Sequence, residues 1–264
     1  MTNSNNTPLI SLNANETALA NQQEPAKKYE FTGETIEVCF KTLHRIRALR
    51  DFGDVKKGDL GGFIQGESNL SHDGNCWVYD DAKVLESATI FHNAKIFDGA
   101  CISGNASVYS DAQVYSRAVV FGNAKVSGSA HVFGDAVVRD KSHVYGDAEV
   151  YNSALIYGDA AVFENARIKN SANVYDNARV YGNAIICGPA LIYNNAKVYG
   201  DVIISCSNFT YEDDINYGNV EIFGDAKVYD SARIYDAVKI FRNAEIRGLA
   251  NIRGNTRIPQ DIKI

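Results

Sequence analysis

The sequence predicts an all-β protein: a triangular parallel solenoid of about 18 residues per coil, preceded by a small N-terminal β cap. Three observations support this prediction. A six-residue pattern repeats through most of the chain, and Gly, Asn or Asp recurs at one place in each repeat. The composition, with 15 Tyr and 12 Phe against one Met and four Pro, also suits strands better than packed helices.

The chain begins with a segment that shows no sustained period. Residues 1–27 are rich in Asn, Thr, Ser and Gln, and we expect them to form a disordered polar tail. Such a tail also leaves open export through a specialised bacterial secretion system. The N-terminus lacks the basic and apolar regions of a secretory signal, which favours a cytoplasmic location.

Residues 28–75 are expected to form the cap. Within them, residues 29–31 and 36–38 flank a Thr-Gly-Glu segment and suggest a short hairpin, and residues 42–48 suggest another strand. A first coil without a cover would present unpaired strand edges, which is why a solenoid needs a cap. Trp77 is expected to close the first coil, with Cys76 at a small inward position.

Residues 76–264 form the repeating region, whose unit reads Ala-x-Val-Tyr-Gly-Asn, as in residues 178–183. Of the twenty positions at six-residue steps from 82 to 196, nineteen are Ala and one is Ser142. Two residues later, from Val84 to Val198, all twenty positions are Val or Ile. Periodicity of this strictness identifies a repeat protein.

Six residues suit one short strand and one corner. The Ala and the β-branched residue point inward with period two, and the residues between them point outward. Gly, Asn and Asp tolerate the positive φ of a tight corner at low cost. Three such sides close one coil, and successive coils pair as parallel strands at roughly 4.8 Å.

One segment breaks the inward pattern. In residues 206–218 the inward positions are occupied by polar residues, among them Asp214, and a buried Asp would be costly. We therefore expect residues 206–218 to form a loop outside the coil.

Composition argues against several kinds of partner. A net charge of −6 and a pI near 5.4 argue against nucleic acid, because no domain-wide basic field is present. The five cysteines are an odd number without a CxxC pair, so no metal site is expected. No apolar run is long enough to cross a membrane. No cofactor is expected for a non-catalytic chain.

The repeat and the segment that leads into it resemble a known family. Besides the hexads, the residues that carry the resemblance are 51–64, 69–71 and 74–80. The chain resembles the hexapeptide-repeat superfamily, and most closely the YdcK-like bacterial family of transferases and prophage-associated proteins, over roughly residues 28–264. The resemblance implies a left-handed β-helix. It also implies a possible acyltransferase, in which a His acts as general base and an acyl-CoA lies between subunits of a trimer.

The chain departs from the acyltransferase pattern in two places. The hexads from 82 to 196 contain no inserted loop, and no helix is expected after the last hexad. Among the five His, His131 and His143 occupy outward strand positions and are the candidates for a catalytic base. An outward His on a solenoid is more often a solvated surface residue, so these two are weak candidates.

Sorting outward residues by an 18-residue coil yields three faces. The first face is apolar and aromatic, and a self-interface that forms a dimer or trimer is its expected use. Its residues include Val119, Phe121, Val137, Leu155, Tyr157, Tyr175, Leu191, Tyr193, Phe209 and Tyr211.

The second face interleaves tyrosines with basic residues and could hold a protein or a glycan. The alternative is that tyrosines one coil apart stack on each other and only stabilise the coils. Its residues include Tyr145, Arg179, Tyr181, Lys197, Tyr199, Arg233 and Tyr235. The third face has mixed charge and is expected to be solvated.

These observations favour a non-catalytic scaffold that self-associates through the first face and presents the second face to a partner. One alternative is a hexapeptide-repeat acyltransferase that uses acetyl-CoA or another acyl-CoA with an unknown acceptor. A further alternative is a prophage or secreted effector protein that acts on a host target.

Overall fold

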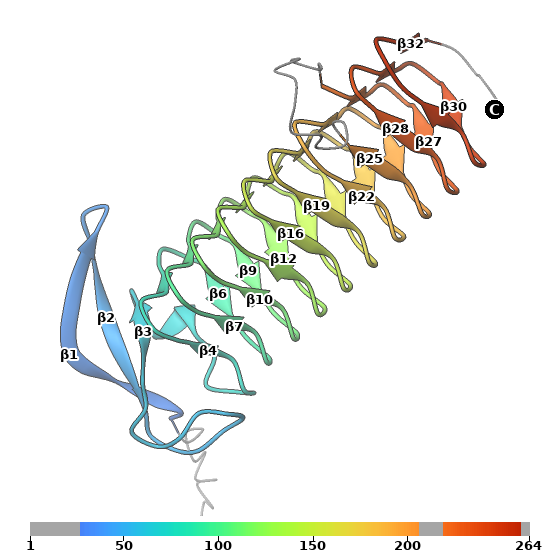
Figure 1. The fold of residues 1–264 in the computed structure, drawn as a ribbon. Helices are drawn as coiled ribbons and strands as arrows, with labels where there is room; N and C mark the ends of the chain where they lie inside the picture. Colours follow the sequence, from blue (N-terminus) through green and yellow to red (C-terminus); the bar gives the residue numbers. More distant parts are fainter. Residues whose placement is uncertain (1–26, 206–218, 260–264) are drawn as a thin grey trace, which may run out of the picture.

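The computed structural model describes residues 27–205 and 219–259, which form an all-β parallel solenoid behind an antiparallel cap (Figure 1). Within these ranges there is no α-helix, only one short 3₁₀ helix, η1 (Glu67–Asn69), and no helix that is long and apolar enough to cross a membrane. The predicted fold class is confirmed.

Three sheets build the sides of the solenoid, and each coil contributes one short strand to each sheet. The first face is the outer surface of the strands β5 (Lys83–Val84), β8 (Cys101–Ile102), β11 (Val119–Val120), β14 (Val137–Val138), β17 (Leu155–Ile156), β20 (Asn173–Val174), β23 (Leu191–Ile192), β26 (Glu221–Ile222), β29 (Lys239–Ile240) and β32 (Arg257–Ile258).

The second face is formed by nine strands: β6 (Thr89–Ile90), β9 (Ser107–Val108), β12 (Lys125–Val126), β15 (His143–Val144), β18 (Ala161–Val162), β21 (Arg179–Val180), β24 (Lys197–Val198), β27 (Lys227–Val228) and β30 (Glu245–Ile246).

The third face is formed by ten strands: β4 (Trp77–Val78), β7 (Lys95–Ile96), β10 (Gln113–Val114), β13 (His131–Val132), β16 (Glu149–Tyr151), β19 (Arg167–Lys169), β22 (Ile185–Ile186), β25 (Ile203–Ser205), β28 (Arg233–Tyr235) and β31 (Asn251–Ile252).

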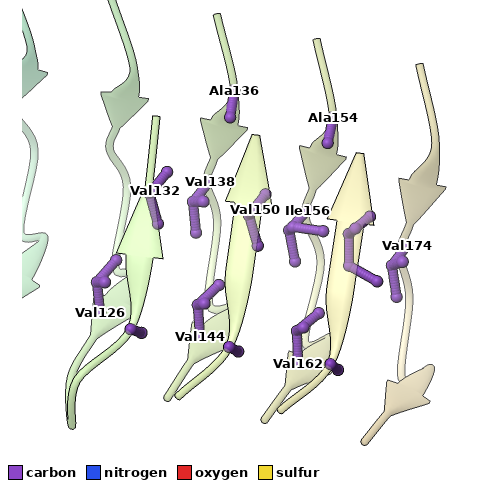
Figure 2. Packing of buried hydrophobic residues seen from close by; sticks show 14 of the residues in the cluster. Val126, Val132, Ala136, Val138, Val144, Val150, Ala154, Ile156, Val162 and Val174 are labelled. Atoms are coloured by element: carbon purple, nitrogen blue, oxygen red, sulfur yellow. The ribbon is translucent and has the colours of Figure 1, made fainter. Parts of the chain in front are cut away.

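The interior is filled by the hexad residues. Every Ala and every Val or Ile of the hexads from Ala82 to Val198 has no exposed surface. Figure 2 shows these side chains pointing into the interior from neighbouring strands, with Val126, Val138 and Val150 among them. Burial of a Val or Ile side chain contributes roughly 1.5–3 kcal/mol, so the column of β-branched residues dominates the stability of the solenoid. Ser142 takes an Ala position, and its hydroxyl donates to the Arg139 carbonyl at 2.7 Å.

The corners combine positive φ with a carboxylate bond between coils. Asp98 and Asp140 both have positive φ, 57° and 63°. The Asp98 carboxylate accepts from the Ser116 amide, and the Asp140 carboxylate accepts from the Gly158 amide, one coil further on. At Gly122 a side chain would meet the Asp140 backbone at 2.8 Å, so the close approach of neighbouring corners favours glycine there. Asp and Gly therefore serve the corner in different ways.

The coil that contains the expected loop is longer than the others. Leu191 opposes Glu221 and Lys197 opposes Lys227, a spacing of 30 residues where other coils have 18. Residues 206–218 themselves lie outside the part of the chain that the structure describes. The twelve additional residues are not a multiple of 18, so every residue after them moves one face further round.

This shift corrects part of the face assignment. Arg233 and Tyr235 lie in β28, which pairs with β25 on the third face, and not on the second face as the uninterrupted count predicted. Lys227 and Tyr229 take the corresponding places on the second face, because β27 pairs with β24.

The cap extends the first sheet. β1 (Tyr29–Val38) pairs antiparallel with β2 (Lys41–Ala48), β2 pairs antiparallel with β3 (Leu60–Ile64), and β3 runs parallel to β5. The predicted hairpin at residues 32–34 is wrong: that segment is a bulge within β1. The turn lies at Cys39 and Phe40, whose φ values of 49° and 60° are those of a tight two-residue hairpin turn.

The first coil is closed by both aromatic and polar groups. Cys76 is fully buried at an inward position, as expected, whereas Trp77 occupies an outward position and is buried beneath the cap, edge-on to Phe52 at 5.3 Å. Lys28 is also fully buried, and its ammonium donates to the Cys76 carbonyl at 2.9 Å. Residues 1–26 lie outside the described residues, so the expected tail is not addressed by the structure.

Candidate functional site

The second face carries a column of cationic side chains in strand register. Lys125 opposes His143, and further along the rod Lys197 opposes Arg179 on one side and Lys227 on the other. The outward position of β18 between these two groups is Ala161. Lys125, Arg179 and Lys197 are exposed, and Lys227 is partly exposed. We refer to Arg179, Lys197 and Lys227 as the basic column.

The basic column is poorly neutralised. Lys227 pairs with Glu245 at 2.7 Å, and this bond raises the pKa of Lys227. Neither Arg179 nor Lys197 makes an ion pair with any residue in the two ranges that the structure describes. Like charges directly opposite each other on neighbouring strands are destabilising, so this arrangement costs stability without an internal return.

The other faces neutralise their cations one coil away. On the third face Arg167 pairs with Glu149 at 3.4 Å, and on the first face Lys239 pairs with Glu221 at 2.6 Å. The same cross-coil register that creates these pairs places only cations in the basic column. The contrast makes the second face the strongest candidate for a binding surface.

A stack of aromatic rings runs beside the basic column. The rings of Tyr145, Phe163, Tyr181, Tyr199 and Tyr229 lie nearly parallel, with centroids 4.7–5.0 Å apart. The prediction that tyrosines one coil apart stack on each other is therefore confirmed. Because each interior ring is covered by its neighbours on both sides, its flat faces are closed to a ligand.

The tyrosine hydroxyls remain hydrogen-bonding groups. Burial raises the pKa of Tyr145, Tyr181 and Tyr199, so these phenols stay protonated at neutral pH. A protonated phenol can donate a hydrogen bond, as can the ammonium and guanidinium groups beside it. The second face is thus a surface rich in donors along one line.

His143 fills a gap in the aromatic stack. Ser127 occupies the rung between Tyr109 and Tyr145, and its hydroxyl lies 3.0 Å from His143 Nε2. The imidazole also lies 4.4 Å from the Tyr145 ring. Burial and the nearby Lys125 cation lower the pKa of His143, which makes the ring neutral near pH 7.

His131 is far from His143 in the topology, since it lies in β13 on the third face. Its ring meets Tyr115 edge-on at 6.2 Å. The structure therefore does not bring the two predicted histidines together. No group of three or more possible metal ligands occurs in the described ranges, although this search leaves out residues 1–26, 206–218 and 260–264.

The first face carries the predicted apolar column. Val119, Val137 and Leu155 oppose one another in consecutive strands and are partly exposed; Asn173 interrupts the column before Leu191. Beside it, Tyr157, Tyr175 and Tyr193 stack at 4.7–4.9 Å, and Arg139 covers the Tyr157 end of the stack. Phe121 precedes Arg139 in the same row, and Phe209 and Tyr211 lie outside the described residues.

Sequence reasoning missed Lys227 and Tyr229 on the second face. Their positions depend on the length of the segment around residue 206, and the polar inward residues there were the available signal. Counting two hexads out of the coil would have moved both residues onto the second face and removed Arg233 and Tyr235 from it.

Comparison with known proteins gives two matches. Residues 172–188 match the family described as the YdcK β-solenoid repeat. A 59-residue segment is 39% identical to the protein of Escherichia coli (strain K12) named "Uncharacterized acetyltransferase YdcK", and it covers 22% of this chain and 17% of that relative. Together with the 18-residue coil, these matches place the solenoid of this chain in the YdcK-like β-helix family.

Proposed function

We propose that this protein is a non-catalytic scaffold that self-associates through the first face and presents the second face to a partner. The observation that carries the proposal is the separation of two chemistries on one rod. The apolar column of Val119, Val137, Leu155 and Leu191 lies on one sheet, and the basic column lies on another. Regular hydrogen bonding between coils keeps the two columns in a constant relation.

Self-association follows from the cost of exposing the apolar column. Solvent-facing positions of a short strand usually carry polar residues, and contiguous aliphatic side chains are removed from water when two such faces meet. A homodimer with this column at its centre would leave the second face of each copy free. The partner of the second face would then meet two parallel or antiparallel rods.

Sedimentation velocity tests the self-association. A Val137→Lys/Leu155→Lys variant should sediment as a monomer at micromolar concentration, where the unaltered chain sediments as a dimer or trimer. The matched control is Gln113→Lys/Ile185→Lys, which places the same charges on the third face. A monomeric unaltered chain, or equal dissociation of the control, would refute the use of the first face.

The name of the similar E. coli protein keeps one alternative in view, an acyltransferase. A neutral His143 could accept a proton from a substrate hydroxyl, but its Nε2 is already engaged by Ser127. Calorimetry with acetyl-CoA tests this alternative, and heat of binding that is lost in His143→Gln would favour it over the scaffold. The effector alternative rests on residues 1–27, and deletion of that segment without loss of export or activity would count against it.

A further inference from the structure

We propose that the ligand of the second face is a linear polysaccharide that carries carboxylate groups, bound along the rod by the basic column. This inference rests on the proposed function, because it names the chemistry of the partner that the second face would receive. Three properties of the surface lead to it: unneutralised charge, a fixed spacing, and the absence of open aromatic faces.

The charge selects an anion. Arg179 and Lys197 have no carboxylate partner among the residues of known placement, and they stand in register with Lys227. The chain as a whole carries a net charge of −6, so the field that attracts an anion is confined to this stripe. A narrow ligand that follows the stripe avoids the acidic remainder, whereas a broad anionic surface would meet it.

The spacing selects a polymer with one charge per coil height. Neighbouring rings beside the column are 4.9 Å apart between Tyr181 and Tyr199 and 5.0 Å apart between Tyr199 and Tyr229. In an extended peptide, side chains on one face repeat at roughly 6.6–6.8 Å, which does not follow this spacing. A pyranose unit is comparable in length to one coil, so a chain of acidic sugars can present a carboxylate to each cation in turn.

The aromatic stack excludes recognition by ring stacking. Proteins that bind single-stranded nucleic acids stack bases on open aromatic faces. Here the faces of Phe163, Tyr181 and Tyr199 are covered by the adjacent rings, and only ring edges and hydroxyls remain. Protonated phenols next to cations suit a ligand with many hydroxyl and carboxylate acceptors, as acidic sugars have.

Binding of polygalacturonate to the full chain tests the proposal. We expect measurable binding that weakens as salt is added, and no binding of fully methyl-esterified polygalacturonate, which retains the sugar chain without its charge. Arg179→Gln/Lys197→Gln/Lys227→Gln should lose affinity by about tenfold or more, since three exposed charge pairs are removed. The control Lys57→Gln/Arg233→Gln/Arg257→Gln changes the net charge equally at exposed positions elsewhere and should bind within about twofold of the unaltered chain.

Several outcomes would overturn the inference. Absence of binding, equal binding of the methyl ester, or equal loss in the control variant would each do so. Equal or tighter binding of poly-L-glutamate or of a thymidine oligonucleotide would assign the stripe to an acidic protein or to nucleic acid instead. A chain that ignores polygalacturonate but still dimerises through the first face would refute the polysaccharide alone, and a chain that binds it as a monomer would refute self-association alone.

Discussion

Lys28 ends the solenoid at its N-terminal side with a single buried ammonium group. Its Nζ lies 2.9 Å from the Cys76 carbonyl and 3.3 Å from the Cys76 sulfur, with the Asp73 and Gly74 carbonyls at 3.5 Å. The cap strands supply amides to the carbonyls of Ala82 and Val84, but no strand reaches Cys76. A flexible side chain therefore completes the cap where the backbone cannot.

Replacing Lys28 tests this role. Lys28→Met keeps most of the volume but leaves the Cys76 carbonyl without its donor, and an unsatisfied buried acceptor costs about 1–3 kcal/mol. The free energy of unfolding, measured by urea titration, should fall by about 2 kcal/mol. Lys57→Met at an exposed position is the control and should change it little; an equal effect in both variants would contradict the assignment.

Two histidines make stability depend on pH. Burial lowers the pKa of both His72 and His143, so each binds a proton less readily in the folded chain than in the unfolded chain. The stability that they contribute is complete above pH 6.5, the ordinary value, and is lost as the pH falls through their lower folded values. Unfolding titrations at decreasing pH should therefore show a decline that is smaller in a His72→Gln/His143→Gln variant; an unchanged slope in that variant would contradict this explanation.

At the scale of elements, three aromatic stacks accompany the three sheets, and they occupy different parts of the rod. On the third face the stack runs through Phe97, Tyr115, Phe133 and Tyr151, nearer the cap. On the second face it runs from Tyr145 to Tyr229, and on the first face from Tyr157 to Phe241. Where one stack ends, the next has begun, so each part of the rod has ring contacts between coils.

Interior and terminal rungs of one stack should differ in cost. Tyr181 stacks with rings on both sides, whereas Tyr229 has one ring neighbour, Tyr199. Aromatic pairs contribute about 0.5–1.5 kcal/mol each beyond the area that they bury. Tyr181→Ala should lower the free energy of unfolding by about twice as much as Tyr229→Ala, and Tyr181→Phe should keep most of it. Equal losses at both rungs would show that stacking is not the source.

The cap hairpin was only partly predictable. The alternation of residues 42–48 was enough to predict β2. The place of the turn was not predictable, because Thr-Gly-Glu has the better turn composition, yet the chain turns at Cys39 and Phe40. Pairing of β1 with β2 over its whole length outweighs that local preference, and Gly33 is accommodated as a bulge.

At the scale of the molecule, the solenoid is a one-dimensional array in which each coil contacts mainly its neighbours. A whole coil should therefore be removable. Deletion of residues 143–160 joins Ser142 to Ala161, which preserves the inward and outward order and the three faces. Far-ultraviolet circular dichroism should retain its β form, and the urea m-value should fall in proportion to the lost surface.

A deletion of residues 143–151 is the matched control. Nine residues are half a coil, so inward positions after the deletion would receive outward residues, and a folded chain is not expected. If the nine-residue deletion folded as well as the eighteen-residue one, the coil would not be the structural unit.

The six-residue period and the inward or outward direction of each side chain were determined by the sequence alone. Both are local properties, because alternation along a strand and the residue types at a corner involve neighbours in the chain. The hand of the winding stays a prediction of the resemblance, since the period does not encode it. Only the tertiary structure decided which residues share a face beyond residue 205, because strand pairing across 30 residues sets that register and depends on how much chain leaves the coil. The burial of Lys28 was decided in the same way, since it requires the cap and the first coil to meet.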